Sequence, residues 1–178
     1  MHEAGTATGA RGAAATGHPL ATRAALDVLA AGGGAADAAV AAHAVLAVVL
    51  PGSCGVGGDA LFLVRDPDGT VTAHNGTGAS AAAEWRIKAA AELPVGTARA
   101  DDGGASVTVP GAVAAWWRVL ARHGRHPAEA VLAPAVRAAD GGVPVFPALA
   151  EQLARQRPRL VRGGAGGWTL LDARPGDV

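Results

Sequence analysis

The chain has 178 residues, 50% of them hydrophobic, and its 15 Lys+Arg balance its 15 Asp+Glu. Because no basic run is interleaved with aromatic residues, the sequence lacks the electrostatic footprint of a nucleic-acid-binding protein. The single cysteine, Cys54, excludes an intrachain disulfide framework and a cysteine-rich metal site. The length suits one domain with a sizeable core, and the apolar share exceeds what a small monomer hides comfortably.

The N-terminal residues, 1–17, are small and predict a flexible start to the chain. They contain no apolar segment of the kind that marks a secretory signal peptide, so a cytoplasmic location is expected. The most apolar run, residues 38–50, contains His43 and is well short of the roughly 20 residues that cross a bilayer. We therefore expect a buried helix there and no contact with a membrane.

Two helices are predicted next. His18-Pro19 places a proline in the first turn of a helix that ends at the glycines 32–34, which can supply a left-handed C-terminal cap. The second helix, 36–50, is apolar nearly all round, as expected for a helix that is covered on both sides, and Pro51 ends it. Asp37 lies in its first turn, where a capping role is favoured over a catalytic one.

A glycine-rich loop follows in "LPGSCGVGGDALFLV", residues 50–64. In a dinucleotide-binding turn the glycines follow a strand and open a helix, whereas here a predicted helix precedes them and a predicted strand follows. No Lys-Ser or Lys-Thr pair follows the last glycine, and Asp59 would repel phosphate. The loop is interpreted as a packing device or a pocket wall, and no cofactor is expected.

A β-hairpin is predicted over residues 60–75, because "DPDGT" is turn chemistry between two apolar or alternating runs. Residues 60–64 are too uniformly apolar for a strand that is wet on one face. The turn "HNGTGAS", 74–80, ends the hairpin with polar side chains, which could contact a substrate or form a plain turn. A short helix is expected over 81–91, and a brief strand in "SVTVPG", 106–111.

The remainder of the chain predicts helices over 112–123, 127–140 and 146–157. No repeat or interdomain linker is evident, and the strands are too few to make a sheet alone. The chain is therefore predicted to be an α+β domain.

No complete set of catalytic residues can be assembled from the sequence by itself. A nucleophilic cysteine needs a base, and the alternative for Cys54 is a small buried residue in a tight loop. His123 and His126 have a spacing that can serve a metal, but a solvated basic turn is the preferred interpretation. Asp59 must be hydrogen-bonded or belong to a site. The histidines whose segments could approach Cys54 are His18, His43 and His74.

Three stretches carry a resemblance to a known family. They are "HPLATRAALDVLAAGGGAADAAVAAHAVLAVVLPGSCGVGGDALFLV", "VTVPGAVAAWWRVLARHGRHPAEAVLAPAVRAADGGVPV" and "RPGDV". In content and order they resemble the N-terminal part of the γ-glutamyltransferases, the γ-glutamyltranspeptidase family of N-terminal-nucleophile hydrolases. The resemblance implies a four-layer αββα sandwich, to which this chain contributes helices and a few strands.

The resemblance also implies an activity. Members of this family cleave themselves into a large and a small subunit, and the threonine freed at the start of the small subunit attacks the γ-glutamyl carbonyl of a substrate such as glutathione. The acyl group then passes to water or to an acceptor amine. The implied partners are therefore the small subunit and a small-molecule γ-glutamyl or related acyl amide.

The implied substrate-binding residues follow the hairpin. The family places an arginine there for the substrate's α-carboxylate, but Thr77 and Ala79 occupy the positions of its two common forms. Neither can replace a bidentate arginine. Arg86 and Arg99 are alternative cations. The predicted substrate-binding residues of this chain are Asp59, Asn75, Thr77 and Ala79, and no catalytic residue or metal ligand is predicted.

Residues 18–178 are thus identified as the N-terminal, large-subunit portion of a γ-glutamyltransferase-like enzyme, and the sequence stops at "RPGDV" before the nucleophilic threonine. We expect the chain alone to be inactive and to need its partner. The alternative is a non-catalytic binding or interaction remnant of the same scaffold, which a stable, soluble monomer without a partner would favour.

Overall fold

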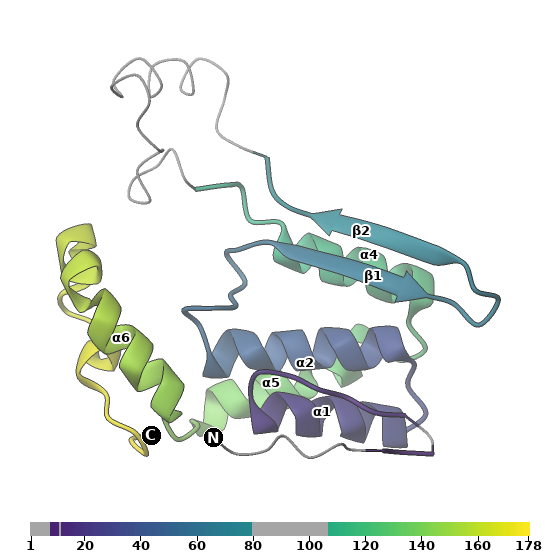
Figure 1. Ribbon diagram of the computed structural model, residues 1–178, viewed down its shortest axis with the longest axis horizontal. Helices are drawn as coiled ribbons and strands as arrows, with labels where there is room; N and C mark the ends of the chain where they lie inside the picture. The colour runs from purple at the N-terminus through teal and green to yellow at the C-terminus, as the bar shows by residue number, and fades with distance from the viewer. Residues whose placement is uncertain (1–7, 11, 80–106) are drawn as a thin grey trace. The chain divides into compact units, whose positions relative to one another are not determined.

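The computed structural model describes residues 8–10, 12–79 and 107–178 (Figure 1). The chain divides into two compact units. The first contains residues 1–55 together with 120–178, and the second contains residues 56–119. Each unit is described separately below.

The first unit begins with helix α1, Pro19–Ala30. His18 caps it, since its Nδ1 accepts a hydrogen bond from the Leu20 amide at 3.1 Å, and Pro19 supplies the preset φ of a first helical residue. The helix ends at Gly32, whose φ of +93° favours glycine, and the Gly33 amide donates to the Val28 carbonyl at 2.9 Å. The predicted start and glycine cap of this helix are confirmed.

Helix α2, Ala35–Val49, is the central element of the first unit. It packs against α1 and against α5, Ala128–Gly141, as the prediction of a helix covered on two sides requires. Alanine and valine allow the helix axes to approach closely at these contacts. The buried residues of α2 are Ala36, Asp37, Ala38, Val40, Ala41, Ala42, Ala44, Val45 and Val49.

The C-terminal part of the first unit consists of α6, Pro147–Leu160, followed by the short turns η2, Val161–Ala165, and η3, Thr169–Asp172. Helix α6 runs one turn further than the predicted 146–157. Leu149, Leu153 and Leu171 form a small apolar cluster that also receives Leu50 from the end of α2.

The second unit is built on an antiparallel hairpin of β1, Ala60–Arg65, and β2, Val71–Gly76. Its turn has the predicted chemistry: Asp68 Oδ1 accepts from the Thr70 amide at 2.8 Å, and Gly69 has a φ of +89°. This hydrogen bond lowers the pKa of Asp68.

The two faces of the hairpin differ in what covers them. Phe62 packs with Ala60 against Ala112 and Ala115 of helix α4, Ala112–His123, whose residues up to 119 belong to this unit. The opposite face is bare in the described residues. Its large apolar side chains are Leu61, Leu63 and Val71, which are 72%, 79% and 60% exposed.

The expected strand at 106–111 is not formed. Residues 107–111 have no assigned strand. Their backbone contacts the segments that flank the hairpin through hydrogen bonds from the Val109 amide to the Ala79 carbonyl at 2.9 Å and from the Gly111 amide to the Gly58 carbonyl at 3.0 Å. The short apolar sequence is followed by Pro110, which has no amide to continue a ladder. The predicted helix at 81–91 lies outside the described residues. No helix in the described ranges is long and apolar enough to cross a membrane.

Candidate functional site

The candidate site lies at the open end of the β1–β2 hairpin. The register pairs Ala60 with Gly76, so Asp59, which precedes β1, lies opposite the chain that leaves β2. Asn75 is exposed, and its Oδ1 accepts a hydrogen bond from the Thr77 amide at 2.8 Å. This contact is an Asx turn, the local structure that asparagine favours where a strand ends.

Asp59 connects two segments that are distant in sequence. Its Oδ1 accepts from the Gly78 amide at 3.2 Å and from the Thr108 hydroxyl at 3.1 Å. The expectation that an acid at this position must be hydrogen-bonded or at a site is met by these two bonds. Because the residue is also exposed, the carboxylate keeps acceptor capacity for a ligand.

Close backbone contacts explain two glycines of this region. A Cβ on Gly78 would overlap the Val109 carbonyl oxygen, and a Cβ on Gly111 would overlap the Gly76 carbonyl oxygen. A larger residue at either position would push the chain after β2 away from the chain before α4. The absence of side chains at Gly78 and Gly111 therefore allows the close backbone approach that brings the polar groups around Asp59 together.

A cation from α4 also reaches the hairpin end. Arg118 Nη1 donates to the Asn75 carbonyl oxygen at 3.3 Å, across 43 residues of sequence. The site thus combines an exposed carboxylate with an exposed guanidinium. Arg118 and Thr108 were not predicted as site residues, because a position in a helix or a loop gives no signal of a contact at this separation in sequence.

The four predicted substrate-binding residues gather in one place. Asp59, Asn75, Thr77 and Ala79 all lie at the end of the hairpin, and Thr77 and Ala79 are exposed. That they bind a substrate stays a prediction. The alternative cations Arg86 and Arg99 lie outside the described residues.

The hairpin end can bind polar groups, but it does not form a nucleophile and its base. In the described ranges, the hydroxyl of Thr108 donates to the carboxylate of Asp59, and that carboxylate also accepts from the Gly78 amide. The arrangement suits ligand positioning.

Cys54 has the features of a structural thiol. It is half-buried, and burial raises the pKa of the thiol, which disfavours the reactive thiolate. Burial lowers the pKa of His18 and of His43. His18 uses Nδ1 as the α1 cap and lies edge-on to Phe146 with 4.7 Å between ring centroids, so it is engaged elsewhere.

The carboxylate of Asp37 is fully buried and does more than cap α2. It accepts from the amides of Gly34 at 2.7 Å, of Arg125 at 3.0 Å and of His126 at 3.4 Å. The start of α2 is thereby joined to the loop that precedes α5. The predicted capping role is confirmed, and the contact with residues 125–126 extends it.

The loop containing His126 is solvated only in part, since Arg125 and Pro127 are exposed while Gly124 is half-buried. His126 is half-buried, and its Nε2 is shielded from solvent without a hydrogen-bond partner among the described residues. Its ring lies next to the backbone of Gly33. The described ranges contain no group of three side chains that could bind a metal.

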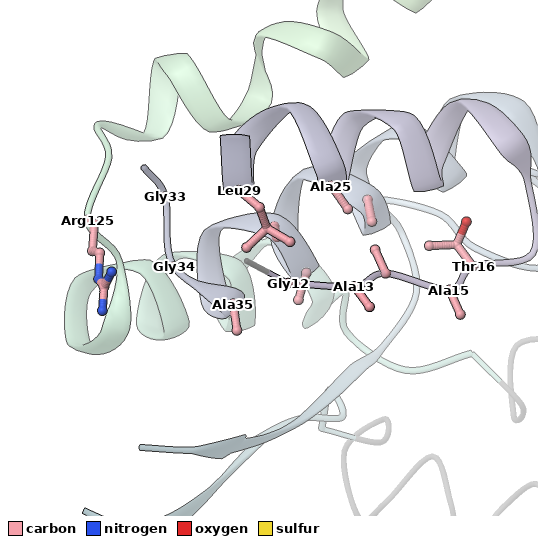
Figure 2. A pocket seen from close by; sticks show the side chains of 14 residues that line it. Gly12, Ala13, Ala15, Thr16, Ala25, Leu29, Gly33, Gly34, Ala35 and Arg125 are labelled. Carbon is pink, nitrogen blue, oxygen red and sulfur yellow. The ribbon is translucent and has the colours of Figure 1, made fainter. Parts of the chain in front are cut away.

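A cleft in the first unit lies between α1, α2 and the segment that precedes α1 (Figure 2). Its volume is about 460 Å³, and small side chains line most of it. Among the described residues that line it, Arg125 is the charged one. Such a surface offers apolar contact and room, but few groups that could orient a small polar molecule.

Comparison with known proteins shows which protein family this chain is related to. The family model described as gamma-glutamyltranspeptidase matches residues 21–169. The chain is 36% identical over 163 residues to the Acylase ACY 1 proenzyme of Pseudomonas sp. (strain V22), covering 88% of this chain and 29% of that protein. It is 40% identical over 131 residues to the Glutathione hydrolase-like YwrD proenzyme of Bacillus subtilis (strain 168), covering 72% and 24%.

Solved structures agree with these matches. The gamma-glutamyltranspeptidase of Helicobacter pylori superimposes with a TM-score of 0.82 at 27% identity, covering 97% of this chain and 51% of that one. The matched proteins define a class of hydrolases and transpeptidases, several of them named as proenzymes. The chain belongs to the γ-glutamyltranspeptidase family. It spans 29% and 24% of the lengths of the two curated relatives.

Proposed function

We propose that this chain is the N-terminal part of a two-part enzyme that cleaves γ-glutamyl or related acyl amides, and that the C-terminal part carries the nucleophilic threonine. The observation that carries the proposal is the apolar face of the hairpin that no described residue covers, in a chain of this family. A hairpin of two strands is marginally stable in water by itself. Its exposed leucines and valine therefore need a covering partner.

The arrangement within the second unit agrees with an αββα sandwich. One face of the hairpin packs against α4 through Ala60 and Phe62. In a sandwich of this kind, the opposite face of a sheet packs against a second sheet about 10 Å away. Leu61, Leu63 and Val71 are the side chains that such a second sheet would bury.

The proposed reaction has two steps. In the first, the threonine hydroxyl of the C-terminal part adds to the substrate carbonyl carbon, and the amine leaves with a proton. The product is an acyl ester on the threonine oxygen. In the second, water or an acceptor amine attacks the ester carbonyl, which releases the acid or the new amide and restores the hydroxyl.

The hairpin end is proposed to bind the acyl part of the substrate. Thr77 and Ala79 stand where the resemblance places an arginine for the α-carboxylate, so the chain lacks that charge at both positions. Arg118 is not a direct replacement for that positive charge, because one of its nitrogens donates to the Asn75 carbonyl. We infer an acyl group that is not selected by an α-carboxylate.

The test uses the complete protein, expressed from its whole reading frame, and the chain 1–178 expressed alone. Substrates are γ-glutamyl-4-nitroanilide and butanoyl-4-nitroanilide, which share the scissile bond and differ in the α-amino and α-carboxylate groups. We expect nitroaniline release from at least one substrate by the complete protein and none by residues 1–178. Turnover by residues 1–178 alone would contradict the proposal.

A second candidate function is a non-catalytic binding or interaction protein on the same scaffold. The absence of arginine at positions 77 and 79 favours it. A complete protein that folds, retains the partner half and still releases no nitroaniline from either anilide would support this candidate. Mass spectrometry of the complete protein after incubation with substrate distinguishes the two further, because only an enzyme forms the acyl ester. The cytoplasmic location stays a prediction.

A further inference from the structure

Three chain segments of the second unit meet at the open end of the hairpin. They lead into β1, out of β2 and into α4, and they consist of residues 58–59, 76–79 and 107–112. Backbone hydrogen bonds join them: the Val109 amide donates to the Ala79 carbonyl at 2.9 Å, and the Gly111 amide donates to the Gly58 carbonyl at 3.0 Å. The segment before α4 is therefore held against both of the others.

Asp59 adds a side-chain link to these backbone bonds. Its Oδ1 accepts from the Gly78 amide and from the Thr108 hydroxyl, groups that are 19 and 49 residues away in sequence. Because both bonds end on one oxygen atom, the carboxylate keeps the two donors close together. Gly78 lies between Thr77 and Ala79, so this link acts at the centre of the segment that is proposed to bind the acyl group.

The segments need such a link because side-chain packing does not fix them. Thr77 and Ala79 are exposed, so their side chains have no core to hold them. Gly78 and Gly111 allow the close approach, since a Cβ on either one would overlap a carbonyl oxygen of the opposite segment. Glycine also has more backbone freedom to lose on folding than any other residue. Hydrogen bonds must therefore select the one conformation in which the segments meet.

We propose that Asp59 is a positioning residue for the proposed reaction: it holds residues 77–79 where they meet the acyl group and does not itself contact the substrate. The proposal rests on the proposed function, which supplies the reaction and the role of the hairpin end. It is supported by the two bonds of Oδ1, which both go to groups of the protein. Displacement of a substrate-positioning group by about 1 Å can cost about 100-fold in rate, so loss of the link should be visible in catalysis.

Two variants of the complete protein separate positioning from contact with the substrate. Asp59→Asn keeps an acceptor oxygen and removes the charge, whereas Asp59→Ala removes both. Because the proposed role needs only an acceptor, we expect Asp59→Asn to keep kcat/KM within about threefold of wild type and Asp59→Ala to lower it by about tenfold or more. Equal losses in the two variants, or no loss in Asp59→Ala, would overturn the proposal.

The kinetic constants give a second distinction. The substrates are the two anilides of the functional test, and only γ-glutamyl-4-nitroanilide has an ammonium group that a carboxylate could bind. For each anilide that the complete protein turns over, we expect Asp59→Ala to lower kcat and to leave KM within about threefold, since a displaced group misaligns the bound substrate. A higher KM for the γ-glutamyl substrate at unchanged kcat contradicts the proposal, because Asp59 would then bind the substrate.

Hydrogen exchange tests the structural part of the proposal without an assay of activity. The Val109 amide bonds to Ala79 and not to Asp59, so its exchange rate reports whether the segments stay together. We expect that amide to exchange about tenfold faster in Asp59→Ala and at nearly the wild-type rate in Asp59→Asn. Asp68→Ala is the matched control and should leave the rate unchanged, because Asp68 is an exposed aspartate that accepts the Thr70 amide at the other end of the hairpin. A wild-type rate at Val109 in Asp59→Ala overturns the proposal.

Thr108→Val is the second variant if circular dichroism shows that Asp59→Ala does not fold. It removes one donor and keeps the shape of the side chain, so Oδ1 retains its bond to Gly78. We expect this variant to lower kcat/KM by about threefold and to speed exchange at Val109 by a similar factor. Wild-type kinetics together with wild-type exchange in this variant would refute the positioning role.

These outcomes are separable from failure of the proposed function. A complete protein that turns over neither anilide, but in which Asp59→Ala speeds exchange at Val109, retains the link and loses the proposed reaction. A complete protein that turns over an anilide with the same constants in wild type and in Asp59→Ala retains the reaction and loses the positioning role of Asp59.

Discussion

Replacing Asp37 is the most informative perturbation of the first unit. The carboxylate has 0% exposure and accepts hydrogen bonds from three backbone amides, those of Gly34, Arg125 and His126. Asp37→Ala leaves all three amides without their acceptor at a part-buried site. At about 1 kcal/mol for each unsatisfied buried donor, the low end of the usual range, the free energy of unfolding should fall by about 3 kcal/mol.

The amide variant separates charge from shape. Both oxygens of Asp37 accept hydrogen bonds, and the Arg125 amide lies within 3.1 Å of each. Asp37→Asn keeps one acceptor oxygen and turns an NH₂ group toward a backbone donor. We therefore expect the free energy of unfolding to fall by about 2 kcal/mol. Asp27→Ala is the control, because Asp27 forms an ion pair with Arg23 while 58% exposed and its loss should cost about 0.5 kcal/mol or less.

Two measurements on the complete protein check this prediction. Urea unfolding gives the change in the free energy of unfolding, and hydrogen exchange reports the amide of Arg125 directly. We expect that amide to exchange faster in both Asp37 variants and at the wild-type rate in Asp27→Ala. If Asp37→Ala unfolds within about 0.5 kcal/mol of wild type, the carboxylate does not stabilise the loop and the reasoning is wrong.

Three further predictions concern the hairpin end and the α1 cap. Ala79→Arg should raise kcat/KM for γ-glutamyl-4-nitroanilide by about tenfold or more, since a charged hydrogen-bonded pair contributes roughly 1.5–3 kcal/mol. Ala79→Gln is the uncharged control and should not raise it. An equal effect of both variants would show that charge is not the cause. Gly78→Ala should destabilise the chain by about 1–3 kcal/mol in thermal unfolding, because its Cβ would overlap the Val109 carbonyl; an unchanged melting temperature would mean that the two segments can separate freely. Burial lowers the pKa of His18 in the folded state. As pH falls below the unfolded pKa of about 6.5, the unfolded state therefore binds a proton before the folded state does. The free energy of unfolding should then decrease by up to about 1.4 kcal/mol per pH unit. His18→Asn keeps an acceptor for the Leu20 amide and should weaken this pH dependence in urea unfolding; the same slope in both proteins would place the titration elsewhere.

Local patterns in the sequence predict most elements of the described structure. Pro19 and the glycines at 32–34 mark the ends of α1, and the Asp-Gly turn marks the hairpin, because caps and turns depend on a few adjacent residues. The predicted helix 112–123 coincides with α4. The prediction of a strand at 106–111 was wrong, since a β-strand forms only where another extended segment pairs with it.

The grouping of Asp59 with residues 75–79 was predicted in part, because a hairpin brings the two ends of its strands together. The contribution of Thr108 and Arg118 was not predictable, since contacts across 49 and 43 residues depend on how α4 packs against the hairpin. For the same reason, Asp37 was identified as a cap but its bonds to residues 125–126 were not.

Sequence alone was sufficient for the family, the hairpin and the helices of the described residues, because each is encoded in short stretches whose chemistry acts locally. Packing in three dimensions was needed to show which polar groups meet at the hairpin end and which face of the hairpin the described residues leave exposed. It also showed that a cleft lies between α1, α2 and the segment that precedes α1. Burial and hydrogen bonding depend on what each group contacts, and those contacts arise only when distant segments fold together.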